Sequence, residues 1–176
     1  MTEWNERRLE ELVQKMGLER TSGEKTPIHL SLYGPSRNSE PLLTKIMCLD
    51  ASKWTALGYD ETDRVSVTRY LGGLGCRTER ALSRATEHQQ PLTLELAKSL
   101  IDAGAFDKGA LGIAAKYQHP LTCELAKLLV DTGAFDDKAL RDAAYFQQPL
   151  PLELARLLID AGACDKSALS EAAQRQ

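Results

Sequence analysis

The sequence has no strong excess of charge and no long apolar run. Its 176 residues include 22 basic and 25 acidic side chains, a formal net charge of -3. Binding to nucleic acid through phosphates draws on a basic excess, so we expect no nucleic-acid partner. There is no apolar stretch of about 18 residues and no signal-peptide core after Met1, so we expect no membrane partner. These absences predict a cytoplasmic protein that acts in its own cell or in a host.

Residues that bind metals or act as nucleophiles are scarce. The four cysteines are widely spaced with no C-x-x-C pair, and there are only three histidines. Cys123 stands where equivalent segments have leucine, and Cys76 where they have alanine. We therefore expect buried thiols, and neither metal ligands nor a disulfide. His119 lies close to Cys123 in the sequence, but Pro120 separates them, and no zinc pair is expected. No metal ion and no cofactor is predicted.

Motifs that carry catalysis are absent as well. The chain has no G-x-x-x-x-G-K-[ST] phosphate loop, no H-E-x-x-H and no G-x-S-x-G. The glycine-rich segment LGGLG (71–75) coincides with the end of a predicted helix, and we do not interpret it as a phosphate-binding loop. We expect no catalytic residue and a protein that is not an enzyme.

What the sequence does contain is an internal repeat. The segment PLTLELAKSLIDAGAFDKGAL begins at Pro91 and nearly recurs from Pro120 and from Pro149, a period of 29 residues. A fixed period of this size indicates stacked units, each of which buries its apolar face against the next. The segment 67–82 aligns with 96–111, so a degenerate second helix precedes the clear copies.

Each copy contains two helical patterns separated by a proline. The first, for example ALGIAAKYQ from Ala110, has a narrow stripe of alanine and leucine that lets a neighbouring helix approach closely. The second, for example CELAKLLVDTG from Cys123, has a wider apolar face and ends at a glycine in the left-handed C-cap conformation, as at Gly133. Between copies, three aspartates precede the next first helix and are predicted to cap it: Asp107, Asp136 and Asp165.

The two ends of the chain differ from the repeats. TEWNERRLEELVQKMGLE (2–19) predicts an amphipathic helix that is capped by Thr2, ends at Gly17 and covers the first repeat. ALSEAAQRQ (168–176) predicts half a repeat that closes the other end of the stack. The N-terminal helix should bury Leu9, Leu12, Val13 and Met16, and both tryptophans, Trp4 and Trp54, are expected in the core.

Two phrases of the sequence resemble a known family of repeats. TPIHLS (26–31) resembles the T-P-L-H-x-A opening of the ankyrin repeat, and LAKLLVDTGA (125–134) resembles its second helix and closing Gly-Ala. The resemblance covers residues 25–176 and implies an all-α fold, an α-solenoid of stacked helix-turn-helix repeats, with a structural role for His29. The chain departs from the family in lacking residues for a projecting finger and in its longer inter-helix turn. A generic α-solenoid of helical hairpins is the alternative.

These patterns divide the chain into three parts. Residues 1–24 are predicted to form an N-terminal capping helix and a linker. Residues 25–80 are predicted to hold two degenerate ankyrin-like units. Residues 81–176 are predicted to hold three regular repeats of 29 residues and a C-terminal half-repeat that caps the stack.

On the first helices the apolar stripe is constant between copies, whereas the remaining face varies. In ankyrin-type stacks the first helices line the concave side, where partners usually bind, so the resemblance implies a binding surface here. Aromatic residues are frequent in interface hot spots, and this face is rich in them. We predict a non-enzymatic module that binds a protein partner, including an inhibitor of the immunity, anti-defence or effector type. The predicted contact residues are Arg84, Glu87, Ile113, Lys116, Tyr117, Arg141, Asp142, Tyr145 and Phe146.

Other interpretations stay open. Tyr117 and Phe146 could pack on the turn proline instead of facing a partner. An enzyme with its site in residues 1–80 would gather His29, Cys48, Asp60 and Arg64. A nucleic-acid binder would use Arg64, Arg69, Arg77, Arg80 and Arg84. Acidic residues interleave with these arginines, which disfavours a binder, and no dense carboxylate stripe supports a nucleic-acid mimic. The patterns leave the partner's identity and the oligomeric state open.

Overall fold

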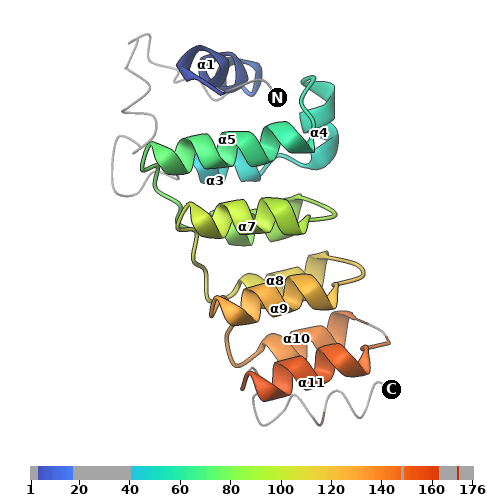
Figure 1. Cartoon of the computed structure of the whole chain (residues 1–176). Coiled ribbons are helices and arrows are strands. Elements are labelled where there is room, and N and C mark those ends of the chain that lie inside the picture. The colour runs from blue at the N-terminus through green and yellow to red at the C-terminus, as the bar shows by residue number, and fades with distance from the viewer. Residues whose placement is uncertain (1–3, 18–40, 148, 163–169, 171–176) are drawn as a thin grey trace.

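The computed structural model describes residues 4–17, 41–147, 149–162 and 170 (Figure 1). No strand occurs among these residues, which confirms the predicted all-α class. None of the helices in this part of the chain is long and apolar enough to cross a membrane. In chain order the helices are α1 (Glu6–Lys15), α3 (Leu42–Met47), α4 (Ala51–Ala56), α5 (Glu61–Gly73), α6 (Ala81–His88), α7 (Leu94–Asp102), α8 (Ala110–Tyr117), α9 (Cys123–Asp131), α10 (Ala139–Phe146) and α11 (Leu152–Asp160).

Several predicted features lie outside the described residues. They include the ankyrin-like phrase at 26–31 with His29, the cap predicted at Asp165, and the C-terminal half-repeat at 168–176 apart from the helical Ser170. Predictions about these segments stay predictions.

The helices pack in two layers that run the length of the molecule. α3, α6, α8 and α10 follow one another in one layer, and α5, α7, α9 and α11 in the other (Figure 1). The pairs α6–α7, α8–α9 and α10–α11 are successive 29-residue copies, each with a first helix, a proline turn and a second helix. Ahead of them, α3 and α5 occupy the places of a first and a second helix, with α4 inserted between them.

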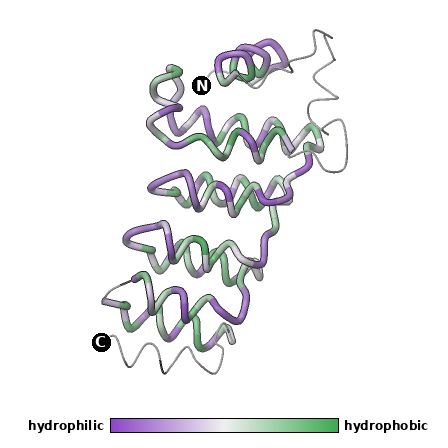
Figure 2. The backbone as a smooth tube through the Cα atoms, turned by 180° about the vertical axis from the view of Figure 1, so that it is seen from behind, coloured by the Kyte–Doolittle hydropathy of each residue, from purple (hydrophilic) through white to green (hydrophobic). Residues whose placement is uncertain are grey.

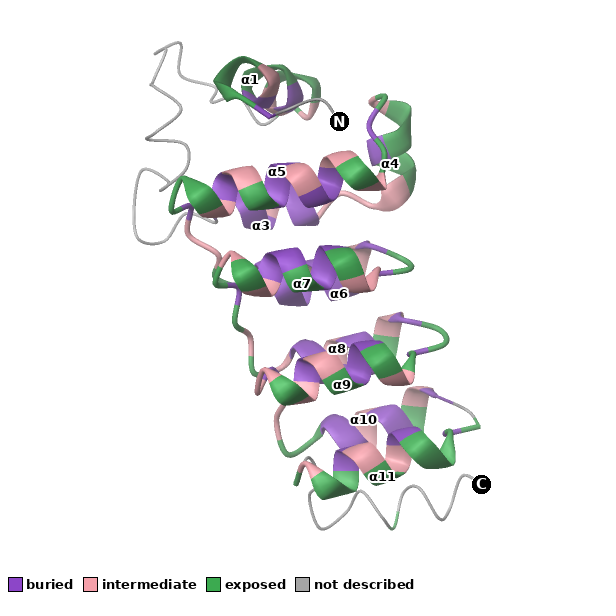
Figure 3. Ribbon diagram, in the orientation of Figure 1, coloured by how far each residue is buried: buried purple, intermediate pink, exposed green. Residues whose placement is uncertain are grey.

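The predicted stripe of small residues on the first helices is buried. In α8, Ala110, Leu111, Ala114 and Ala115 are each 0% exposed. Figure 2 shows that apolar and polar residues alternate along the helices. Because alanine adds little bulk, α6, α8 and α10 lie close enough to share one continuous core. Buried positions accordingly face the inside of the two layers (Figure 3).

The second helices pack less uniformly, and Gly72 explains the difference. A Cβ atom at Gly72 would lie 2.6 Å from the Cβ of Ala103, so α5 and α7 touch where α5 has no side chain. The equivalent positions on the later second helices hold Ile101, Val130 and Ile159. A branched side chain cannot be accommodated at so short a distance, and it holds the neighbouring helix away.

The predicted glycine stops are confirmed. Gly75, Gly104, Gly133 and Gly162 follow the second helices with φ of 70°, 87°, 72° and 74°. The left-handed conformation strains any residue with a Cβ, so glycine ends each second helix at this point. Gly17 likewise has φ of 64° after α1.

The cap predicted at Asp107 is wrong, and Asp136 bonds outside the helix that it was predicted to cap, because it accepts the N–H of Lys138, the residue before α10, at 3.0 Å. The N-cap residues of α6, α8 and α10 are Arg80, Gly109 and Lys138, and none makes a side-chain cap. Asp107 instead accepts the N–H of Ser83 at 3.0 Å, in the first turn of α6, the first helix of the preceding copy. At this step the later copy therefore contributes to the start of the preceding copy's first helix.

The N-terminal helix α1 caps the start of the stack. Its N-cap is Asn5, whose side chain accepts the N–H of Arg8 at 3.0 Å, and not Thr2 as predicted. Leu9 and Leu12 are fully buried, as predicted, and Trp4 and Trp54 lie in the core at 6% and 0% exposure.

A polar contact fixes α1 to the beginning of α5. The Nη2 of Arg8 lies 2.6 Å from Oδ1 of Asp63, and its guanidinium lies 4.4 Å from the ring centre of Trp4. Tyr59 packs between the two tryptophans, with ring centres 5.8 Å from Trp4 and 6.0 Å from Trp54. Aromatic packing and a half-buried ion pair together hold the helix in place.

Candidate functional site

The nine predicted contact residues lie on the first helices α6, α8 and α10, and we call them the first-helix face. Because the repeat is regular, they form columns of equivalent positions in adjacent helices. One column holds Arg84, Ile113 and Asp142, and the next holds Glu87, Lys116 and Tyr145. A third column contains Tyr117 and Phe146, and Arg141 completes the set. The packing of α6 on α8 and of α8 on α10 makes these columns continuous across three copies.

An aromatic cluster lies on the first-helix face at the C-terminal ends of α8 and α10. The rings of Tyr145 and Phe146 meet edge to face with centres 4.7 Å apart. The Nζ of Lys116 lies 4.9 Å from the ring centre of Tyr117 and 5.9 Å from that of Phe146. A cation over an aromatic face is attracted to it, so Lys116 joins the rings of two adjacent copies. The structure thus brings together four of the predicted contact residues.

The residues of this cluster differ in exposure. Tyr145 is 46% exposed and is one of the large apolar or aromatic side chains that reach solvent. Lys116 is exposed as well, whereas Tyr117 and Phe146 are half-buried. Ile113, another predicted contact residue, is half-buried. The accessible part of the cluster is therefore Lys116 and Tyr145, supported by the two half-buried rings.

Charged residues flank the cluster in local pairs. Nη1 of Arg84 lies 2.9 Å from Oε2 of Glu87, and Nε of Arg141 lies 3.6 Å from Oδ1 of Asp142. A Cβ at Gly112 would lie 2.9 Å from the Asp142 carboxylate, so that carboxylate sits directly over the glycine of the preceding copy. Partial burial there raises the pKa of Asp142, and the charge of Arg141 opposes the rise.

Three glutamines that we had not predicted as structural link the copies beneath this face. Gln89, Gln118 and Gln147 are the C-cap residues of α6, α8 and α10, and they are at most 5% exposed. Buried side-chain amides need partners for both donors and the acceptor. We call these three residues the glutamine ladder, because each one bonds to the backbone of the copy before it.

The two regular steps of the ladder are equivalent. Nε2 of Gln118 donates to the carbonyls of Thr86 and Gln89 at 2.7 and 2.9 Å, and its Oε1 accepts the N–H of Leu92 at 2.7 Å. Thr86 and Gln89 carry carbonyls at the end of α6 that no helical N–H can satisfy. Gln118 therefore caps the C-terminal end of the preceding first helix.

One copy later, Gln147 makes the same three bonds. Its Nε2 donates to the carbonyls of Ala115 and Gln118 at 2.6 and 2.8 Å, and its Oε1 accepts the N–H of Leu121 at 2.9 Å. Nδ1 of His119 lies 3.2 Å from the same Nε2. Identical bonds at a spacing of one repeat fix the rotation of each copy relative to the next.

The first step of the ladder is irregular. Nε2 of Gln89 donates to the carbonyls of Met47 and Leu49, but its Oε1 accepts Nη1 of Arg64 at 2.5 Å and not a backbone N–H. The equivalent N–H belongs to Asp63, which lies in the first turn of α5 and is bonded to the capping residue Asp60. The longer α5 thus removes the backbone donor, and the buried Arg64 replaces it.

The sequence contains a pattern from which the glutamine ladder could have been predicted. Glutamine recurs at the period of 29 residues, at 89, 118, 147 and again at 176, the last of which lies outside the described residues. A polar residue that recurs next to alanines of the buried stripe indicates a repeated buried hydrogen bond.

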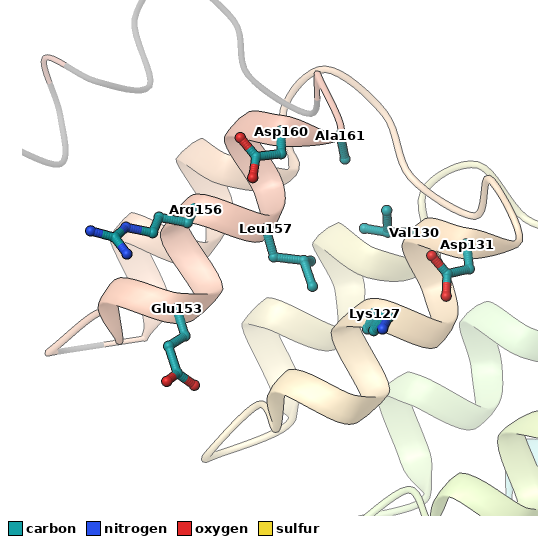
Figure 4. A pocket seen from close by; sticks show the side chains of 8 residues that line it. All are labelled: Lys127, Val130, Asp131, Glu153, Arg156, Leu157, Asp160 and Ala161. Atoms are coloured by element: carbon teal, nitrogen blue, oxygen red, sulfur yellow. The ribbon is translucent and has the colours of Figure 1, made fainter.

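A groove lies on the other layer of the molecule, between α9 and α11. It has a volume of about 550 Å³ and is lined by apolar Val130, Leu157 and Ala161 at its base, with charged side chains around them (Figure 4). The charged residues are Lys127, Asp131, Glu153, Arg156 and Asp160. Val130 is the equivalent of Gly72, so the groove opens where a branched residue replaces the glycine.

The residues of the enzyme alternative do not form a reactive cluster among the described residues. Asp60 is the N-cap of α5 and forms a reciprocal capping box with Asp63, and Arg64 is engaged with Gln89. Cys48 is half-buried, and His29 lies outside the described residues. The described ranges also contain no group of three or more His, Cys, Asp or Glu side chains that could hold a metal ion.

The other candidate groups also have structural surroundings. Burial raises the pKa of the Cys76 thiol, and partial burial with the nearby charges of Glu153 and Glu124 raises that of Cys123. Cys76 is buried as predicted, whereas Cys123 is only half-buried. Three of the arginines of the nucleic-acid alternative, Arg69, Arg77 and Arg84, contact the carboxylates of Glu95, Glu79 and Glu87.

In comparisons with known proteins, no family model matches the chain, and neither a curated protein nor a solved structure matches it. The first-helix face, the glutamine ladder and the groove are therefore interpreted from their own geometry.

Proposed function

We propose that the chain is an α-solenoid of ankyrin-like repeats that binds a protein partner through its first-helix face. The regular pairs α6–α7, α8–α9 and α10–α11, stacked at one repeat period, support the solenoid interpretation. In this proposal the protein is a non-enzymatic module of the cytoplasm, and it acts by occupying a surface of its partner. We propose that such a small stack acts as an inhibitor of the immunity, anti-defence or effector type.

The observation that carries the proposal is the aromatic cluster on α8 and α10. Tyr145 combines a large apolar ring with a polar hydroxyl and is 46% exposed, a combination enriched at the centres of interfaces. Its ring is held by Phe146, and the neighbouring Lys116 is held over the rings of Tyr117 and Phe146. Side chains that are already fixed lose less conformational freedom on binding, which favours affinity.

The glutamine ladder supports a rigid mode of binding. Gln118 and Gln147 directly follow Tyr117 and Phe146 in the chain, so the hydrogen bonds between copies fix the backbone beside the cluster. A variable row of side chains on a fixed frame selects a partner by shape and charge, without a conformational change in the frame.

A capture experiment with matched variants tests the proposal. The wild-type chain and the double variant Lys116→Glu with Tyr145→Asp are immobilised and exposed to lysate of the native host. We expect a stoichiometric protein to be retained by the wild type and lost from the double variant. A control variant, Lys98→Glu, makes the same lysine-to-glutamate exchange on the exposed face of α7 and should retain the protein.

Circular dichroism of each variant establishes that it is folded before capture is compared. Retention of the protein by both the wild type and the folded double variant would contradict a site on the first-helix face. The absence of any stoichiometric protein would contradict the binding function itself and would favour the test of an activity in residues 1–80.

A further inference from the structure

The groove between α9 and α11 has an apolar base and a charged rim. Val130 of α9 and Leu157 and Ala161 of α11 form the base, and all three are half-buried. The charged side chains of the rim are all exposed. Apolar surface that still meets water gains free energy when a ligand covers it, so the base can supply affinity and the rim can supply selectivity.

The width of the groove keeps its rim charges apart. Between α5 and α7, which touch at Gly72, Nη2 of Arg69 lies 3.3 Å from Oε1 of Glu95. Lys127 and Glu153 occupy the same two repeat positions on either side of the groove, but they form no such ion pair. The same holds for every rim charge with respect to the described residues: Lys127, Asp131, Glu153, Arg156 and Asp160.

The charge of the rim changes sign along the groove. Lys127 and Asp131 lie one turn apart on α9, and Asp160 has on α11 the repeat position that Asp131 has on α9. Two carboxylates therefore stand on opposite sides of one end of the groove (Figure 4). The guanidinium of Arg156 points away from α9, so Lys127 is the cation beside the apolar base (Figure 4).

The two carboxylates stand where a helix disfavours them. Asp131 and Asp160 are the last residues of α9 and α11, and the negative end of the helix dipole repels an anion there. Neither side chain has a hydrogen bond or an ion pair with another described residue that would offset this repulsion. A cation placed between them would be attracted by both carboxylates and by the two helix ends.

We propose that the groove binds an amphipathic helix of a protein partner, with a basic residue of that helix between Asp131 and Asp160. The apolar face of the bound helix covers Val130, Leu157 and Ala161, as in other complexes of a helix with an apolar groove. An acidic residue one turn before the basic one faces Lys127. The bound helix thus runs in the same direction as α9 and α11.

The spacing of the rim charges favours a helix as the occupant. Lys127 and Asp131 are four residues apart, so a helix with an acidic and a basic residue four apart presents opposite charges at the same spacing. Acidic residues early and basic residues late are also the order that the dipole of the bound helix favours. A partner with charge of one sign, such as a nucleic acid, would meet repulsion at one end of the groove.

This inference goes beyond the proposed function, because the groove lies in the second-helix layer and not on the first-helix face. A single short helix in the groove buries less than the roughly 1,200 Å² of a standard interface. We therefore expect dissociation in the micromolar range and a marked weakening by salt, which screens the exposed charges.

Fluorescence anisotropy of the full chain with labelled synthetic peptides tests the inference. The probe is an alanine-based helix of about 15 residues with glutamates in its first turns, leucines along one face and arginines in its last turns. A second peptide has glutamates in place of the arginines. The wild-type chain should bind the second peptide at least about tenfold more weakly than the first.

Exchange of charge on the protein should reverse this preference. Asp131→Lys combined with Asp160→Lys should release the arginine peptide and bind the glutamate peptide instead. Asp102→Lys is the matched control, because Asp102 has the same repeat position on α7 but does not line the groove, and it should bind like the wild type. Ala161→Trp fills the groove without a change of charge and should weaken the binding of the arginine peptide.

Circular dichroism establishes that each variant is folded. A wild-type chain that does not bind the arginine peptide would overturn the inference, and this is also the result if a second copy or another segment of the chain fills the groove. Binding that survives the exchange at Asp131 and Asp160 would overturn it too, since the peptide would use another surface. Lys116→Glu with Tyr145→Asp should still bind the peptide, which separates this test from that of the first-helix face.

Discussion

The side-chain amide of Gln147 donates to the backbone carbonyl of Gln118, its own equivalent one repeat earlier, at 2.8 Å. Gln118 bonds to the carbonyl of Gln89 in the same way at 2.9 Å. These bonds satisfy carbonyls at the ends of α8 and α6 that the helices themselves leave unpaired. The C-terminal ends of these first helices are therefore capped by a side chain of the next copy, and this contact joins neighbouring copies of the stack.

Removal of one step of the ladder should destabilise the whole stack. Gln118→Ala leaves the N–H of Leu92 and the carbonyls of Thr86 and Gln89 without their partner, in a site where Gln118 is 4% exposed. We expect a loss of about 2–4 kcal/mol in the free energy of unfolding, since buried groups that lose a hydrogen bond are costly. Urea denaturation followed by circular dichroism measures this loss.

The adjacent glutamine provides the control for that experiment. Gln90 is exposed and makes one bond, from its Nε2 to the carbonyl of Glu87 at 3.1 Å. Gln90→Ala should change stability by less than about 0.5 kcal/mol, as exposed substitutions usually do. Equal effects of the two substitutions would contradict a structural role for the ladder.

A methyl group at Gly72 should destabilise the contact between α5 and α7. In Gly72→Ala the new Cβ meets the Cβ of Ala103, at 2.6 Å before relaxation. Overpacking of this kind costs about 1–3 kcal/mol, which exceeds the gain of up to about 1 kcal/mol from the better helix propensity of alanine. Thermal and urea unfolding measure the net effect.

Two further variants make this test specific. Gly73→Ala lies in the same helix with nothing within 4 Å of the added Cβ, and it should stabilise the protein. The double variant Gly72→Ala with Ala103→Gly should recover part of the loss, because the two positions share one contact. If Gly72→Ala stabilised the protein as much as Gly73→Ala, the close approach of α5 to α7 would be disproved.

The attachment of α1 should depend on Arg8. Its guanidinium contacts both Asp63 and the ring of Trp4, with the Arg8 side chain 21% exposed. Arg8→Ala should lower stability by about 1–2 kcal/mol through loss of the ion pair and of the cation–aromatic contact. Tryptophan fluorescence should shift to longer wavelength, since Trp4 becomes more exposed to water.

Arg7 is the matched control for Arg8. Its side chain is 88% exposed and pairs with Glu11 within the same helix. Arg7→Ala should leave both the unfolding midpoint and the fluorescence maximum nearly unchanged. A fluorescence shift in Arg7→Ala as large as that in Arg8→Ala would indicate general fraying of α1 and not a specific contact.

The carboxyl group of Asp142 should make a pH-dependent contribution opposite in sign to that of most aspartates. Its pKa is raised in the folded state by partial burial, so the folded protein binds this proton more readily than the unfolded chain. Stability from this group is present at low pH and is lost as pH rises through the folded pKa. Asp142→Asn should therefore be more stable relative to wild type near neutral pH than in acid.

Urea denaturation of both proteins at several pH values below and above the ordinary aspartate range tests this sign. The difference between variant and wild type is the quantity of interest, because the other carboxylates cancel in it. A difference that stays constant with pH, or that changes in the opposite direction, would contradict the partial burial of Asp142 over Gly112.

Much of the fold followed from periodicity. The 29-residue period placed α6 to α11 and the glycines that end the second helices, because helix formation and left-handed C-caps depend on residues close in the sequence. The all-α class and the buried alanine stripe followed for the same reason. The cap predicted at Asp107 failed because this side chain bonds to the first turn of α6 in the preceding copy, a contact that the local sequence does not specify.

The candidate surface was only partly set by the sequence. The columns of residues on the first helices follow from the repeat, but the contacts of Lys116 with the rings of Tyr117 and Phe146 depend on how α8 packs against α10. The sequence by itself determined which residues share a helix face, since that is a matter of 3.6-residue periodicity. Only the tertiary structure decided which carbonyls at helix ends the glutamines cap and which second helices touch, because these depend on distances between helices that are remote in the chain.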